Sequence, residues 1–346
     1  MIAWALLTHL LTVLVAFPAG LTGQEAARPP GGDTTSVLLQ RRVHSVAPTA
    51  HGGMELVVDL YRPLEGALRG AVVLLHGGGF ATRHVDIGEN KIYGQALAQR
   101  GFLAVAAEYR SVRDEPVVDG WGADYARMLR ELGDPRLEGA MDQLGPGYPD
   151  AVAAAALDLI AAVGWLRDRA DELGLDPDRI ALFGASSGGI SAITTAYAME
   201  LYGEENLDVA GVIELRGTLL RPDTTVNPFD ADDPPLLMLH GERDRGFPLP
   251  EIEAVFRAAR EAGTPVQLLS SPEHGHDLGG RALLDLRVDG GRSVVDHIDA
   301  FLRAAFAGAP WPEGPERGRL VGSELTPRPR GTPGSPARSR RAGPPG

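Results

Sequence analysis

The chain has 346 residues, of which 44% are hydrophobic and 23% are charged, and its formal net charge at pH 7 is −13. This composition is that of an ordinary globular protein and excludes a wholly disordered chain, a collagen-like repeat and a membrane protein with many spans. The acidic balance argues against a nucleic-acid partner, because phosphate binding needs a positive surface. The absence of cysteine excludes disulfides and thiolate catalysis.

The chain starts with an apolar run, IAWALLTHLLTVLVAF, at residues 2–17. Its length is typical of a signal-peptide core and is short for a bilayer span. We therefore expect residues 1–23 to be a signal peptide or an N-terminal anchor, which would be the only part to contact a membrane. The protein is then expected to be secreted or associated with the cell envelope, and to be cytoplasmic if the start is misassigned. Residues 24–36, rich in Gly, Pro and Ala, are expected to form a linker.

From residue 37 to 307, short aliphatic runs alternate with helical patterns, which is typical of βαβ units around a mostly parallel sheet. Two opening runs, starting at Val37 and Met54, flank a turn-rich patch and predict an antiparallel hairpin. Continuous apolar runs then predict strands buried on both faces at 71–76, 102–109, 179–183, 209–215, 236–240 and 266–271. Helical patterns cover 150–171, 191–201, 250–262 and 293–305.

Two segments do not fit this alternation. The connection at 112–147 is longer than is usual in an α/β domain, and one helical face of it carries Trp121, Tyr125, Met128, Leu129 and Leu132. It is interpreted either as a lid or pocket wall, or as an amphipathic helix that packs on the domain. The tail, 308–346, is dominated by Pro, Gly and Arg and is expected to be disordered.

The sharpest motif is Gly-Ala-Ser-Ser-Gly-Gly at residues 184–189, directly after a predicted strand and before a helical pattern. This is the setting of a G-x-S-x-G nucleophile elbow, in which a tight turn exposes Ser186 and flanking glycines make room for the backbone. A second motif, His-Gly-Gly-Gly-Phe, starts at His76 at the end of another predicted strand. Consecutive glycines can turn backbone N–H groups toward an oxyanion.

A serine nucleophile needs a base and an orienting carboxylate, which follow it in the chain order Ser, Asp or Glu, His. Asp244 lies deep in the loop after the strand at 236–240, whereas Glu242 falls earlier in the same turn, so we favour Asp244. Residues His274 and His276 follow the last long strand, and the residues alone leave both open as the base. A metal site is disfavoured, because His274, His276 and Asp277 lack a partner motif. We expect no metal and no organic cofactor.

Over residues 43–306 the sequence resembles the α/β-hydrolase superfamily, and within it esterases of the hormone-sensitive-lipase and feruloyl-esterase-like groups. The resemblance implies an α/β-hydrolase fold. It also implies an oxyanion hole formed by the N–H groups of Gly77, Gly78 and Ser187. The usual elbow of these families is G-D-S-A-G-G, so Ala185 and Ser187 stand here in place of Asp and Ala.

Two further family motifs match the segments that contain the candidate acid and the candidate base. The family pattern H-G-x-x-D-x-x-V-P matches residues 240–248, with Phe247 for Val, and points to Asp244. The pattern G-x-G-H-x-F places the base at His276, with Glu273 and Leu278 as departures.

Together these features predict a serine hydrolase in which Ser186, His276 and Asp244 cleave a small-molecule carboxylic ester through an acyl-enzyme. Short to medium acyl or aryl esters are implied by the resemblance alone. The alternatives are an exopeptidase or acyltransferase with the same triad, and a non-catalytic binding protein on a hydrolase scaffold.

Overall fold

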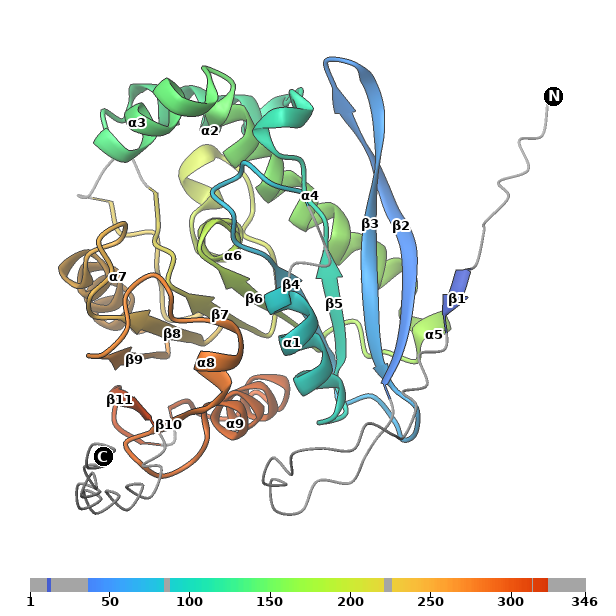
Figure 1. Ribbon diagram of the computed structural model, residues 1–346, viewed down its shortest axis with the longest axis vertical. Coiled ribbons are helices and arrows are strands. Elements are labelled where there is room, and N and C mark those ends of the chain that lie inside the picture. The colour runs from blue at the N-terminus through green and yellow to red at the C-terminus, as the bar shows by residue number, and fades with distance from the viewer. Residues whose placement is uncertain (1–10, 14–36, 84–87, 221–225, 313, 323–346) are drawn as a thin grey trace, which may run out of the picture.

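The computed structural model describes residues 11–13, 37–83, 88–220, 226–312 and 314–322. In these residues the strands form one sheet in the order β1-β2-β3-β5-β4-β6-β7-β8-β9-β11-β10 (Figure 1). The strands are β1 (Leu11–Val13), β2 (Val37–Thr49), β3 (Gly52–Pro63), β4 (Ala71–Leu75), β5 (Leu103–Ala107), β6 (Ile180–Ala185), β7 (Gly211–Leu215), β8 (Leu236–Gly241), β9 (Val266–Ser271), β10 (Leu286–Val288) and β11 (Arg317–Gly322).

The strand directions place the functional motifs at one point of the sheet. β2 and β3 form the predicted antiparallel hairpin, and β3 pairs antiparallel with β5. β4 pairs parallel with both β5 and β6, and the parallel series continues to β9. Because the chain passes from β4 to β5 on one side and then to β6 on the other, the strand order reverses at β4. A crevice opens outside the carboxyl ends of the strands at such a reversal, and both glycine-rich motifs follow strands that meet there.

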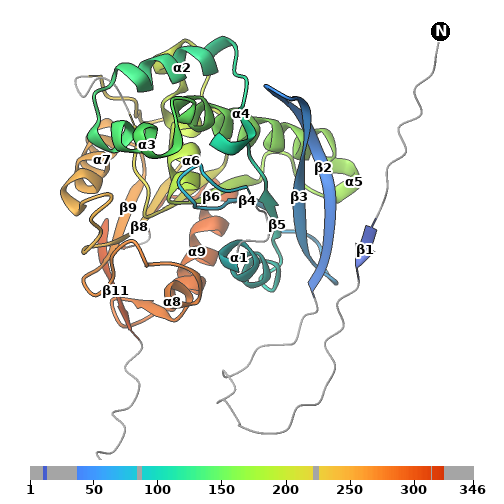
Figure 2. The same cartoon turned by 45° about the horizontal axis from the view of Figure 1, so that its top comes forward.

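Helices cover both faces of the sheet (Figure 2). They are α1 (Gly88–Ala98), α2 (Gly120–Glu131), α3 (Pro135–Leu144), α4 (Tyr148–Asp168), α5 (Ala170–Leu173), α6 (Ser187–Tyr197), α7 (Leu249–Ala262), α8 (Gly280–Leu284) and α9 (Val294–Phe306), with short 3₁₀ turns η1 (Val112–Asp114) and η2 (Met199–Tyr202). α2, α4, α6 and α7 share one apolar core with Val73 and Leu75 of β4, whereas α1, α8 and α9 share the other with Val72 and Leu74. The prediction of a mostly parallel sheet with helices on both faces is confirmed.

The longest helix, α4, is a core element. Among the described residues it is the one helix that is long and apolar enough to cross a membrane, but 72% of its apolar window is buried inside the protein. Its alanine-rich faces pack against α2 and α6 and the sheet beneath them. The apolar character of α4 is therefore explained by burial in the core.

The insertion at 112–147 forms η1, α2 and α3, a helical layer beside α4 (Figure 2). The apolar stripe predicted from the sequence faces the core: Tyr125 and Leu129 are fully buried, and Trp121, Met128 and Leu132 are partly buried against the same cluster. This is the arrangement of the packed-helix interpretation.

A buried ion pair ties this layer to the sheet. Arg110, directly after β5, lies 2.8 Å from Asp158 of α4, and both side chains are almost fully buried. The Arg110 guanidinium also donates to Pro48 O of the hairpin and to Val117 O of the insertion. Since a buried charge is costly unless paired and hydrogen-bonded, this set of contacts fixes three segments distant in the sequence.

The expected domain boundary at 307 is wrong. Residues 317–322 form β11, which pairs parallel with β9 and antiparallel with β10, and Leu320 is fully buried. Before it, Trp311 packs edge-on against Phe301 of α9. The edge of β9 offers unpaired backbone groups, so a segment with few apolar residues still adds a strand there. Residues 323–346 of the predicted tail lie outside the described residues.

At the other end, β1 is the described part of the predicted signal peptide or anchor, and it pairs antiparallel with β2. The remainder of 1–23 and the predicted linker at 24–36 lie outside the described residues.

Candidate active site

Ser186 occupies a sharp turn between β6 and α6. Its backbone has φ 53° and ψ −117°, a conformation that costs energy for a residue with a side chain. The turn depends on glycine at two positions, because a Cβ at Gly184 would collide with Gly188 O and a Cβ at Gly188 would collide with Leu75 O. The Ser186 N–H donates to Leu215 O of β7 at 2.8 Å, which anchors the turn to the neighbouring strand. The predicted elbow is therefore built as the sequence indicated.

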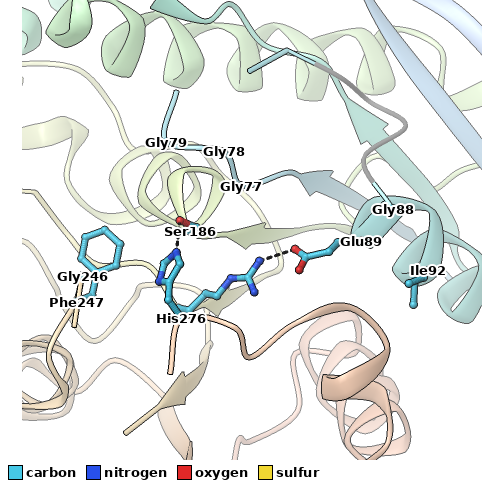
Figure 3. Close-up of a pocket in the computed structure, with 11 residues that line it drawn as sticks. Gly77, Gly78, Gly79, Gly88, Glu89, Ile92, Ser186, Gly246, Phe247 and His276 are labelled. Carbon is cyan, nitrogen blue, oxygen red and sulfur yellow. Dashed lines mark hydrogen bonds and ion pairs between the residues drawn. The ribbon is translucent and has the colours of Figure 1, made fainter. Parts of the chain in front are cut away.

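The structure brings the three predicted residues together (Figure 3). Ser186 Oγ lies 2.9 Å from His276 Nε2, and His276 Nδ1 lies 2.7 Å from Asp244 Oδ2. The Asp244 side chain is fully buried, whereas the His276 side chain is 45% exposed. Since a carboxylate is only an acceptor, Nδ1 carries the proton and Nε2 can accept the serine proton.

Asp244 is held by its own loop. Its Oδ1 accepts the N–H groups of Gly246 and Phe247 at 2.8 and 3.0 Å, which leaves Oδ2 for His276. The competing acid, Glu242, instead accepts a hydrogen bond from Ser270 Oγ at 2.8 Å. The structure thus places Asp244, and not Glu242, beside His276.

The competing base has another partner. His274 Nδ1 lies 2.8 Å from Ser271 Oγ, so the two histidines of this loop have separate surroundings. Within the described residues, no group of three or more His, Asp or Glu side chains is placed to hold a metal ion.

The glycine loop after β4 lies directly against the nucleophile turn. A Cβ on Gly77 would stand 3.2 Å from Ser186 Cβ, so this position leaves little room for a side chain. Gly78 and Gly79 both have positive φ, at 127° and 61°, which favours glycine. Among the described residues, the N–H groups of Gly77 and Gly78 have no protein acceptor. The N–H of Ser187 belongs to the first turn of α6, where amides lack an intrahelical partner.

Ser186 lines a cavity of about 870 Å³, and Figure 3 shows the residues around it. Its walls comprise Gly77, Gly78, Gly79, Gly88, Glu89, Ile92, Ser186, Arg216, Gly246, Phe247 and His276. No residue of the 112–147 insertion is among those described wall residues. Arg136 of the insertion contacts one wall residue, since its guanidinium lies 5.3 Å from the centre of the Phe247 ring.

Sequence reasoning missed the ion pair in this wall. Arg216 follows β7 with φ 48°, and its guanidinium donates to Glu89 Oε2 at 2.6 Å and to Leu278 O at 2.8 Å. It thereby joins α1 to the loop that carries His276. The signal was present, because Arg216 directly follows a predicted parallel strand, at the edge where α/β sheets place their sites.

Beneath the elbow lies a fully buried carboxyl, Glu214 of β7. One of its oxygens accepts the Gly217 N–H, and the other has no partner among the described residues. Burial, with a smaller contribution from the nearby Asp244, raises the pKa of Glu214 from 4.5 to about 8. The folded protein therefore keeps a proton here that the unfolded chain releases above its ordinary pKa.

The sign of the resulting pH dependence follows from linkage. Because the native state binds more protons than the unfolded state between pH 4.5 and about 8, stability falls as pH rises through this window. The side chain in Glu214→Gln is neutral at every pH, so this variant should not show the loss of stability that Glu214 causes. Between pH 4.5 and about 8, we expect the free energy of unfolding of the variant to rise by a few kcal/mol relative to that of the wild type. Urea unfolding near pH 5 and near pH 9 measures this. The exposed Glu131→Gln is the control, and a parallel pH dependence of Glu214→Gln and wild type would refute the effect.

Comparison with known proteins agrees with this geometry. Residues 149–218, which include the elbow, match the BD-FAE family model. A thermophilic esterase of the planctomycete Thermogutta terrifontis with bound propionate is similar in structure, with a TM-score of 0.58 and 20% sequence identity over 80% of this chain and 97% of that chain. Thermogutta terrifontis esterase 2 phosphorylated by paraoxon gives a TM-score of 0.56 and 20% identity over 83% and 100% of the two chains. No curated protein matches the sequence. The structural likeness shows a shared fold.

Proposed function

We propose that this α/β-hydrolase is a serine carboxylesterase that cleaves small carboxylic esters through an acyl-enzyme. The single observation that carries the proposal is the continuous relay from Ser186 through His276 to the buried Asp244, at 2.9 and 2.7 Å, on a strained turn that faces a cavity. A serine held in this way is activated for attack on a carbonyl.

In the first half-reaction, Ser186 Oγ attacks the ester carbonyl carbon while His276 Nε2 takes the serine proton. Asp244 keeps Nδ1 protonated and stabilises the imidazolium that forms. The carbonyl oxygen becomes an anion, which the N–H groups of Gly77, Gly78 and Ser187 are placed to receive. Collapse of the tetrahedral species expels the alcohol, which takes the proton from His276.

In the second half-reaction, water attacks the acyl-enzyme, and His276 Nε2 accepts the proton from that water. The same backbone donors stabilise the second tetrahedral species, and its collapse returns the proton to Ser186 Oγ and releases the carboxylic acid. The 45% exposure of the His276 side chain gives water a route to this step.

The substrate class is supported by the cavity and by the structural neighbours. Ile92 and Phe247 give the wall apolar surface on opposite sides of Ser186 (Figure 3). The structurally similar esterase of Thermogutta terrifontis is known with propionate and with butyrate bound. We therefore propose short to medium acyl or aryl esters as substrates.

The test is reaction of the purified protein with a fluorophosphonate probe, followed by p-nitrophenyl esters from acetate to decanoate. We expect stoichiometric labelling of the folded protein and the highest kcat/KM among the shorter acyl chains. Folded protein that remains unlabelled and does not cleave any ester would contradict the proposal and favour a binding protein on this scaffold.

A further inference from the structure

The glycine loop is joined to the nucleophile turn by a short chain of hydroxyl groups. The Gly79 N–H donates to Ser187 Oγ at 3.1 Å. Ser187 Oγ lies 3.2 Å from the Tyr109 hydroxyl, which donates to His76 O at 2.8 Å. This series of hydrogen bonds thus leaves the glycine loop at Gly79 and returns to it at His76.

The direction of each hydrogen bond follows from the number of protons. Tyr109 has one hydroxyl proton, and His76 O, at 2.8 Å, is an acceptor only, so that proton is used there. The 3.2 Å contact of the same hydroxyl with His76 Nδ1 does not take it, because Nδ1 is itself the donor to Gly77 O at 2.6 Å. At the 3.2 Å contact Ser187 must then be the donor to Tyr109 Oη, which leaves a Ser187 lone pair for the Gly79 N–H. Burial raises the pKa of Tyr109, so its hydroxyl stays protonated over the working range of an esterase.

The side chains that take part in this series of hydrogen bonds are shielded from water. Tyr109 and Ser187 are each 1% exposed, and His76 is fully buried with its ring stacked 4.3 Å from the Tyr109 ring. Hydrogen bonds in such surroundings are costly to leave unmade, because no solvent replaces a lost partner. The loop segment His76–Gly79 is otherwise composed of glycines, two of them with positive φ, and a glycine backbone has wide conformational freedom.

We propose that the Ser187 and Tyr109 side chains are positioning residues for catalysis: they hold the glycine loop against the elbow so that its free N–H groups face the developing oxyanion. Ser187 then has two separate tasks, one for its N–H and one for its hydroxyl. We call the hydrogen-bonded set Gly79, Ser187, Tyr109 and His76 the clamp. The G-D-S-A-G-G elbow that this sequence resembles has alanine in place of Ser187 and lacks its hydroxyl, so the clamp is a feature of this protein. The inference rests on the proposed esterase function.

The test uses Ser187→Ala and Tyr109→Phe, which each remove one hydroxyl and leave Ser186, His276 and Asp244 in place. Matched controls are Ser191→Ala, one turn further along α6, and Tyr125→Phe, another fully buried tyrosine with a hydroxyl contact. For each variant we would measure kcat and KM with a p-nitrophenyl ester, and the inhibition constant of a trifluoromethyl ketone, which forms a tetrahedral oxyanion on the serine.

We expect kcat to fall about tenfold to a hundredfold in both hydroxyl variants, somewhat less than for loss of a whole oxyanion donor. KM should change little, because the oxyanion forms only in the transition state, and the ketone should bind more weakly by a similar factor. The double variant should have the same kcat and the same ketone affinity as the single variants, since either change breaks the same series of hydrogen bonds. The pH profile of kcat/KM should keep its midpoint, because the contact between His276 and Asp244 is untouched.

The clamp is overturned if Ser187→Ala and Tyr109→Phe match their controls in kcat and in ketone affinity. It is also overturned if they lose only thermal stability while kcat is retained. Should Ser187→Ala fail to fold, Tyr109→Phe decides the matter alone. Failure of the clamp is distinguishable from failure of the esterase proposal. The esterase proposal fails if the wild type neither reacts with the fluorophosphonate nor cleaves an ester, or if hydrolysis persists in Ser186→Ala. The clamp fails if the wild type is active and depends on Ser186 but the hydroxyl variants match their controls.

Discussion

Replacing Ser186 with alanine is expected to lower kcat for ester hydrolysis by about a millionfold, the loss seen when a triad nucleophile is removed from a serine hydrolase. Without Oγ no acyl-enzyme forms, and His276 has no hydroxyl to deprotonate. The measurement is single-turnover and steady-state kinetics with a p-nitrophenyl ester, beside mass spectrometry of the protein after fluorophosphonate treatment.

Folding is not at risk in this variant. The side chain is removed from a turn with φ 53°, and the Ser186 N–H that anchors the turn to Leu215 O is unchanged. Ser191→Ala, a buried serine of α6, is the matched control and should label and turn over as the wild type does. Ester hydrolysis that persists in Ser186→Ala would refute the mechanism.

Replacing Asp244 with asparagine should lower kcat by about ten-thousandfold, as it does for the orienting aspartate of other triads. An asparagine can present its N–H₂ group to His276 Nδ1, which then has to be the acceptor. The proton moves to Nε2, the atom that has to accept the proton from Ser186. The amide oxygen still accepts from Gly246 and Phe247, so the loop keeps its shape.

Glu242→Gln is the matched control, since it makes the same chemical change two residues away. Glu242 is bonded to Ser270 and not to the base, so its amide should leave kcat within about twofold of the wild type. The two variants are compared by kcat and KM with one ester at several pH values. Equal losses in both, or full activity in Asp244→Asn, would show that the carboxylate has no role in orienting His276.

Local patterns predicted the central strands closely, and they predicted the helices α4, α6, α7 and α9. The runs at 71–76 and 236–240 became β4 and β8, because continuous apolar residues bounded by glycine have few alternatives to a strand buried on both faces. Helix α1 carried no clear apolar periodicity and was not predicted. Its Tyr93 and Leu97 are buried only because the second core forms against them.

The edges of the domain could not be predicted in this way. The segment that forms β11 is poor in apolar residues and rich in arginine, the composition of a disordered tail. It becomes a strand because the backbone of β9 is available to pair with it. Such pairing depends on a partner that is distant in the sequence.

The sequence by itself determined the fold class, and it singled out Ser186 as the candidate nucleophile and the chain order Ser, Asp, His, because glycine spacing and strand periodicity are local properties of the chain. The sequence favoured Asp244 over Glu242 from its place in the loop, and the resemblance favoured His276 over His274. Only the tertiary structure showed that Asp244 and His276 meet, since this depends on which side chains cross the gap between two loops. It alone also revealed the Arg216–Glu89 pair and the hydroxyl chain through Ser187 and Tyr109. These contacts join residues that are tens of positions apart or more, and no local pattern records which atoms folding brings within hydrogen-bond distance.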